Sequence, residues 1–227
     1  MTSDTVLPAE LSPSETHYKS GGAVTEILNS LTHALGAGLS IAGLIVLLIL
    51  TADDPSPWKV VGFSVYGASQ ILLYLSSATM HGFWAFPRLR YYLRILDQVL
   101  IYVMIAGTYT PLCLIAMRGN GGWWIFGIIW GLAVAGIFLK GVVFKEPHIV
   151  SDLLYLPMGW MLLFFLRPLI ENVPTGFLVW ALIGAASFSI GIIFYILQRF
   201  PFFHTIWHLF VISGSVSFFL GYALHLA

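Results

Sequence analysis

The sequence predicts an all-α membrane protein, a bundle of seven transmembrane helices with its N-terminus in the cytoplasm and its C-terminus outside. Of its 227 residues, 59% are hydrophobic and only 9% are charged, whereas a soluble domain carries about 25% charged residues. A larger soluble core cannot absorb this deficit in a chain of this length. The apolar residues also gather into stretches long enough to cross a bilayer, which needs about 20 residues for each helix.

The first three predicted helices are separated by charged or proline-containing connections. The first covers residues 23–52 and ends at an Asp-Asp-Pro sequence. The second covers residues 58–83 and is followed by an arginine-rich connection. The third covers residues 94–117, and Pro111 inside it predicts a kink because proline lacks the backbone donor that a helix needs.

The remaining four predicted helices follow with short connections that leave no room for a soluble domain. Residues 123–144 follow a Gly-Asn-Gly turn, and residues 151–170 form the fifth helix, with Pro157 inside it. Residues 175–197 follow a proline-containing turn, and residues 204–226 close the chain. The sequence therefore predicts a transmembrane domain over residues 23–227.

Residues 1–22 are polar and predict a flexible cytoplasmic tail. This tail has no apolar core of its own, so no cleavable signal peptide is expected. The net charge of the chain is zero, which gives no basis for nucleic-acid binding. Cys113 is the only cysteine and lies in an apolar run, so we expect neither a disulfide nor a thiolate metal site.

The distribution of basic residues predicts the orientation. Cytoplasmic ends of membrane helices carry an excess of Lys and Arg. The side that holds the N-terminal tail has most of the 10 Lys and Arg residues: Lys19, Arg88, Arg90, Arg94, Lys140, Lys145 and Arg199, against Lys59, Arg118 and Arg167 on the other side. We therefore expect a multi-pass protein of the plasma or inner membrane with a cytoplasmic N-terminus.

Polar and ionisable residues inside the predicted helices lie at one depth. Such residues are costly in a bilayer and usually have a function. The first, third and seventh helices start on the cytoplasmic side and the second ends there, so the topology brings their polar residues into one layer. These residues are Glu26, Asn29 and His33 in the first helix, Ser77 and His81 in the second, Asp97 in the third, and His204 and His208 in the seventh.

Three of these residues predict a metal site. His204 and His208 are four residues apart, so they lie one turn apart on one helix face. With His81 they supply three imidazoles, which suit Zn²⁺ with an open fourth position, although iron and manganese also accept such ligands. Zinc would lower the pKa of a bound water to about 7. Asp97 is then placed to act as general base, and Ser77 to steady the water, a ligand or a substrate oxyanion.

The predicted function is hydrolysis of a lipid amide or ester, because a membrane lipid reaches a site among helices in the inner leaflet most directly. Glu26, Asn29 and His33 are interpreted as a supporting polar network rather than a second metal site. Two alternatives stay open. One is a non-enzymatic sensor of membrane state in which zinc braces the helices, and the other is a cytolysin or channel. The sequence identifies neither the substrate nor the oligomeric state.

The motifs in these helices resemble those of the hemolysin III family, which belongs to the progestin and adipoQ receptor superfamily that includes the adiponectin receptors. The resemblance covers the chain from about Glu26 onward. Gln98 departs from it, because His or Tyr is expected after the aspartate. The motifs that carry the resemblance are Glu26-x-x-Asn29-x-x-x-His33, Ser77-x-x-x-His81, Leu96-Asp97, the segment from Ala106 to Pro111, and His204-x-x-x-His208.

The resemblance implies a seven-helix bundle with its N-terminus inside and a zinc ion held by His81, His204 and His208. It further implies that Asp97 contacts the zinc-bound water and that Ser77 matches the serine of the family site. The superfamily is also grouped with alkaline ceramidases, which implies an amide hydrolase. The family name implies membrane lysis, whereas bacterial relatives are linked to membrane fluidity and energetic homeostasis.

Overall fold

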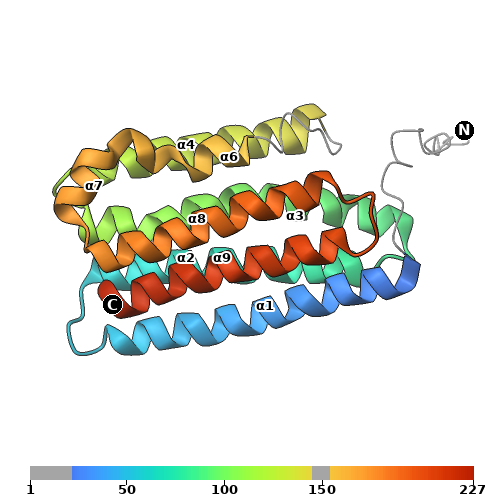
Figure 1. The fold of residues 1–227 in the computed structure, drawn as a ribbon, viewed down its shortest axis with the longest axis horizontal. Coiled ribbons are helices and arrows are strands. Elements are labelled where there is room, and N and C mark those ends of the chain that lie inside the picture. The colour runs from blue at the N-terminus through green and yellow to red at the C-terminus, as the bar shows by residue number, and fades with distance from the viewer. Residues whose placement is uncertain (1–21, 145–153) are drawn as a thin grey trace, which may run out of the picture.

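The computed structural model describes residues 22–144 and 154–227, and helices are the only regular elements among these residues (Figure 1). Six helical spans are long and apolar enough to cross a membrane. The prediction of an all-α, multi-pass membrane protein is therefore confirmed. The six spans are α1 (Gly22–Leu50), α2 (Pro57–Gly82), α3 (Pro87–Pro111) with its continuation to Ala116, α4 (Gly122–Phe138) with its continuation to Val143, α8 (Thr175–Ile196) and α9 (Phe203–His225).

Two predictions from the sequence include residues outside the described part of the chain. The predicted tail covers residues 1–22, of which only Gly22 is described. The fifth predicted helix begins at residues 151–153, which also lie outside the described part of the chain. The cytoplasmic position of the N-terminus stays a prediction.

Helix α3 begins earlier than the sequence predicted. Its first turn is at Pro87, where the missing backbone donor of proline costs nothing because the first helical N–H groups have no partner inside the helix. Arg90 therefore lies on the helix itself rather than in a connection, and Arg94 lies two turns into the helix rather than at its start. After Pro111 the chain continues as a π-helix over Leu112–Ala116, in agreement with the irregularity that this proline predicted.

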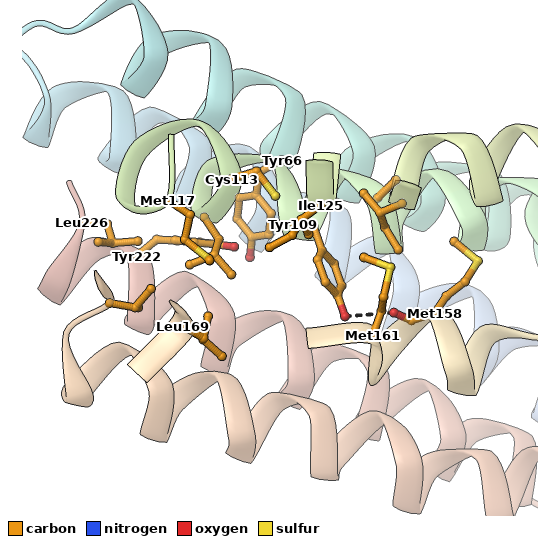
Figure 2. Packing of buried hydrophobic residues seen from close by; sticks show 14 of the residues in the cluster. Tyr66, Tyr109, Cys113, Met117, Ile125, Met158, Met161, Leu169, Tyr222 and Leu226 are labelled. Atoms are coloured by element: carbon orange, nitrogen blue, oxygen red, sulfur yellow. Dashed lines mark hydrogen bonds between the residues drawn. The ribbon is translucent and has the colours of Figure 1, made fainter. Parts of the chain in front are cut away.

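The fifth predicted helix, which contains Pro157, is not continuous in the described part of the chain. The described part divides into α6 (Tyr155–Gly159), a 3₁₀ turn (Met161–Phe165) and α7 (Leu166–Asn172). At the break the Tyr109 hydroxyl of α3 shares its single proton between two main-chain carbonyl oxygens, those of Met158 (2.9 Å; dashed line in Figure 2) and Gly159 (2.7 Å). These bonds satisfy acceptors that an unbroken helix would pair internally, which a membrane protein requires. A seventh crossing through this broken segment stays a prediction.

The helices pack so that four ends carrying polar residues lie together. Helix α2 packs between α1 and α3, α9 packs between α1 and α8, and α4 packs on α3. The starts of α1, α3 and α9 and the end of α2 lie at one end of the bundle, on the right in Figure 1. This arrangement brings the residues selected from the sequence into one layer.

The larger apolar cluster fills the rest of the bundle and contains buried residues of α2, α3, α4, α6 and the last turns of α9 (Figure 2). Tyr222 of α9 and Leu226, which directly follows this helix, contribute to it from the end opposite the polar layer. A smaller cluster of Ala37, Leu73, Tyr74, Met104 and Val211 lies nearer the polar residues. The polar layer is therefore backed by close apolar packing that fixes the helices around it.

Candidate metal centre

Three imidazoles converge at the polar end of the bundle. Candidate ligand atoms of His81, His204 and His208 all lie within 4.8 Å of one another. His81, in the last turn of α2, and His208 are buried, and His204 is half-buried. Phe202 adopts a left-handed conformation (φ 63°) where the chain turns into α9, and the two α9 histidines follow in the first two turns. The structure thus brings together the three histidines that the sequence selected as ligands.

In each of the three rings, Nδ1 faces an oxygen atom within hydrogen-bond distance. This arrangement favours the tautomer that carries its proton on Nδ1 and presents Nε2 as the metal ligand. Hydrogen bonds of this kind also fix the orientation of a ligating ring. The three pairs are His81 with Glu26 Oε2 (2.7 Å), His204 with Gln198 Oε1 (3.0 Å) and His208 with the main-chain oxygen of Asn29 (3.1 Å).

The residues present fit a divalent metal. Nε2 of His81 is buried and has no hydrogen-bond partner among the described residues, which is rare for a buried polar atom. A metal ion on this nitrogen would satisfy it. Zn–N bonds of about 2.0–2.1 Å place three ligating nitrogens about 3.3 Å apart around one ion. The observed ligand atoms lie within 4.8 Å of one another, so the side chains would move closer together on binding the ion. Three imidazoles suit zinc, and this donor set also suits iron.

Helix α1 braces the proposed ligands through Glu26 and Asn29. The Glu26 carboxylate is almost completely buried, and it accepts hydrogen bonds from His81 and from Arg90 Nη2 (2.5 Å). The side-chain oxygen of Asn29 accepts a hydrogen bond from the Thr205 hydroxyl (2.5 Å). The interpretation of Glu26 and Asn29 as supporting residues agrees with this geometry. Their contacts tie α1 to α2, α3 and α9.

Arg90 is a member of this network that the sequence analysis counted only as an orientation signal. Because α3 starts at Pro87, Arg90, Arg94 and Asp97 share one face of the helix at spacings of four and three residues. The sequence displays this spacing, but it does not display the pairing of Arg90 with Glu26, because that contact joins two helices.

We expect the Glu26→Gln substitution to weaken metal binding by about 10- to 100-fold, the usual effect of removing a carboxylate that supports a metal-bound histidine. Glutamine keeps the size of the side chain but loses the charge that strengthens the hydrogen bond to His81. Competition with a chelator measures the affinity. The control is Glu171→Gln, which alters an exposed ion pair with Arg167 in α7 and should leave the affinity unchanged. Equal affinities in both variants would contradict the supporting role.

Asp97 and Ser77 lie beside the imidazoles but outside the three-histidine cluster. Their side chains interact with each other, and both line the cavity that His204 and His208 also line. Asp97 is not in the group of ligand atoms that lie within 4.8 Å of one another. This position suits a residue that acts on a water or substrate next to the metal rather than a direct ligand. The base and serine roles of these two residues stay predictions.

The cavity has a volume of about 480 Å³ and is lined by polar side chains in one part and by apolar side chains in the rest. The polar part of its lining consists of charged, amide and imidazole side chains, which include Arg90, Arg94, Gln198, His33, His204 and His208. Its other walls are largely apolar and include Met104, Ile105, Phe188, Val211 and Phe218. A molecule that places an apolar chain against these walls would hold its polar part among the histidines, Asp97 and Ser77.

Comparison with known proteins gives the family of the chain. The Haemolysin-III related family model matches residues 22–219. The chain is 42% identical over 194 residues to Hemolysin-3 of Bacillus cereus, covering 86% of this chain and 88% of that protein. It is 39% identical to the Hemolysin-3 homolog of Bacillus subtilis (strain 168), again over 194 residues, covering 86% of this chain and 91% of the relative.

A more distant match is the human Monocyte to macrophage differentiation factor. This protein is 27% identical over 197 residues, covering 82% of this chain and 78% of the relative. The resemblance drawn from the helix motifs is thus confirmed by the family model and by two bacterial relatives. The chain belongs to the Haemolysin-III related family.

Proposed function

We propose that this protein is a zinc-dependent hydrolase that cleaves an amide or ester bond of a membrane lipid near the cytoplasmic leaflet. One observation carries the proposal: two histidines of the cluster, His204 and His208, line a single cavity with largely apolar walls, which Asp97 and Ser77 also line. Structural metal sites are closed by protein ligands, whereas catalytic sites keep a position open. Three ligands beside a cavity support the catalytic class.

The shape and lining of the cavity support a lipid as substrate. Apolar side chains of α3, α8 and α9 form much of its wall, so it suits an acyl chain. The helices around it are long enough to cross a bilayer, so a lipid is the most abundant molecule nearby. The predicted cytoplasmic N-terminus would place the polar layer in the inner leaflet.

A divalent metal held by three imidazoles supplies Lewis-acid polarisation of a carbonyl and activation of water. The Asp97 carboxylate would accept the proton of the attacking water and pass it to the leaving nitrogen or oxygen. The Ser77 hydroxyl, which interacts with that carboxylate, would hold it in position. Apolar walls keep bulk water away and strengthen each of these polar interactions.

The test of this proposal is the release of fatty acid by the purified, zinc-loaded protein. N-palmitoylsphingosine and phosphatidylcholine are offered as the amide and the ester substrate, and mass spectrometry quantifies palmitate. Release that depends on zinc and on Asp97 supports the proposal. If neither lipid yields fatty acid, the alternative of a membrane sensor braced by structural zinc is favoured.

A second candidate function, lysis of membranes, is favoured by the names of the bacterial relatives, Hemolysin-3 and Hemolysin-3 homolog. Leakage of an encapsulated dye from liposomes that contain the protein measures this activity directly. Leakage that persists in a variant without metal would assign lysis to the bundle itself rather than to the metal centre.

A further inference from the structure

His33 of α1 is a buried imidazole whose hydrogen-bonding capacity is unused. Its side chain lies against the histidine cluster, and the residue is only 4% exposed. Both ring nitrogens are buried and lack a hydrogen-bond partner within residues 22–144 and 154–227. Buried polar groups nearly always have a partner, so an imidazole with two unpaired nitrogens calls for a specific explanation.

The ring of His33 packs against two other aromatic rings. It stacks on His208 with ring centroids 3.5 Å apart and an interplanar angle of 12°. On another side, the ring of Tyr74 packs edge-on against it at 5.0 Å. Tyr74 is itself fixed, because its hydroxyl donates to Ser215 Oγ (2.7 Å) and its ring packs closely against Gly36.

His33 lies at the wall of the cavity. His33 lines the same cavity as Ser77, Asp97 and His208. It does not belong to the group of three histidines whose ligand atoms lie within 4.8 Å of one another, so it is not a fourth member of that cluster. His33 therefore contributes to the cavity wall directly beside one of the proposed metal ligands, His208.

We propose that His33 is a substrate-binding residue, in which one ring nitrogen donates a hydrogen bond to the carbonyl oxygen of the acyl group that enters the cavity. This inference rests on the proposed function for the class of substrate. A neutral imidazole carries one donor and one acceptor, so it can bind a carbonyl oxygen with its N–H. Stacking on His208 would align that carbonyl beside the metal centre, where the bond to be cleaved must lie.

The experiment uses a ligand pair that differs in the carbonyl and cannot be hydrolysed. Hexadecyl methyl ketone carries the carbonyl and octadecane does not. We expect the zinc-loaded full-length protein in detergent to bind the ketone more tightly than the alkane. In His33→Phe the ring and its stacking remain but both nitrogens are lost, so the ratio of the two dissociation constants should fall about tenfold, the effect of losing one hydrogen bond in a dry site.

Two further variants separate hydrogen bonding from packing. His33→Gln lacks the ring but offers an amide donor and acceptor, so it should recover part of the preference for the ketone. Ile105→Val alters the apolar wall of the same cavity and should leave the preference unchanged. Zinc content is measured for each protein and should stay at the wild-type level in all three variants.

The inference is overturned if His33→Phe keeps the full preference for the ketone, if it loses its zinc, or if the wild-type protein shows no preference. Should His33→Phe fail to fold, the comparison of His33→Gln with Ile105→Val decides. The inference is then overturned if His33→Gln binds the ketone no more tightly than it binds octadecane. Ketone binding without release of fatty acid from any lipid would instead reject the proposed hydrolase and leave the role of His33 intact.

Discussion

Replacing His204 and His208 together with alanine should leave the purified protein with less than about a tenth of its metal, because a zinc site needs at least three protein ligands. The double variant removes two of the three imidazoles and leaves only His81 in α2. A single histidine does not hold a zinc ion against a chelating buffer. Inductively coupled plasma mass spectrometry measures the metal for each protein chain.

The matched control for this prediction is His225→Ala. His225 belongs to the same helix, but it lies in the last turn of α9 and packs against Gly176, far along the helix from the first turns. This variant should keep the full metal content. Metal that survives in the double variant, or that is lost equally in the control, would show that the ion binds elsewhere.

Asp97→Asn should lower lipid hydrolysis by about 10²- to 10⁴-fold, the usual contribution of a general base. Asparagine keeps the shape of the side chain and can still accept a hydrogen bond from Ser77, but its amide does not take up a proton at neutral pH. Since Asp97 lies outside the cluster of ligand atoms, the metal content should not change. The measurement is the rate of palmitate release from N-palmitoylsphingosine by the zinc-loaded protein.

The control for Asp97 is Asp54→Asn. Asp54 is an exposed carboxylate that pairs with Lys59 in the connection between α1 and α2, so its loss should leave the rate unchanged. A zinc-loaded Asp97→Asn protein that hydrolyses lipid at the wild-type rate would remove Asp97 from the mechanism. Loss of zinc together with activity would make it a structural residue of the centre.

The location of the site was predictable because membrane helices alternate in direction. Each helix of about 20 residues crosses the bilayer once, so successive helices run in opposite directions and their ends alternate between the two sides. That alternation alone places His81, at the end of α2, at the same depth as His204 and His208, at the start of α9. The structure confirms that these three residues meet.

Other features depend on tertiary contacts that a single sequence does not display. The break after α6 is stabilised by the Tyr109 hydroxyl, and nothing near Met158 in the chain reveals that a tyrosine of α3 donates there. The sequence indicates only that Arg90 lies on the cytoplasmic side. In the structure α3 begins at Pro87, so Arg90 lies on this helix and donates a hydrogen bond to Glu26. The sequence predicts that His33 belongs to a polar network with Glu26 and Asn29. Among the described residues, however, neither ring nitrogen of His33 makes a hydrogen bond.

The central claim is that three histidines bind a metal with one position open to the cavity. Zinc K-edge X-ray absorption of the purified protein tests this claim directly, because it reports the type and distance of each ligand. The prediction is three imidazole nitrogens and one oxygen donor, all at about 2.0–2.1 Å. A protein without zinc, or a zinc ion closed by a fourth imidazole or a sulfur ligand, would contradict it.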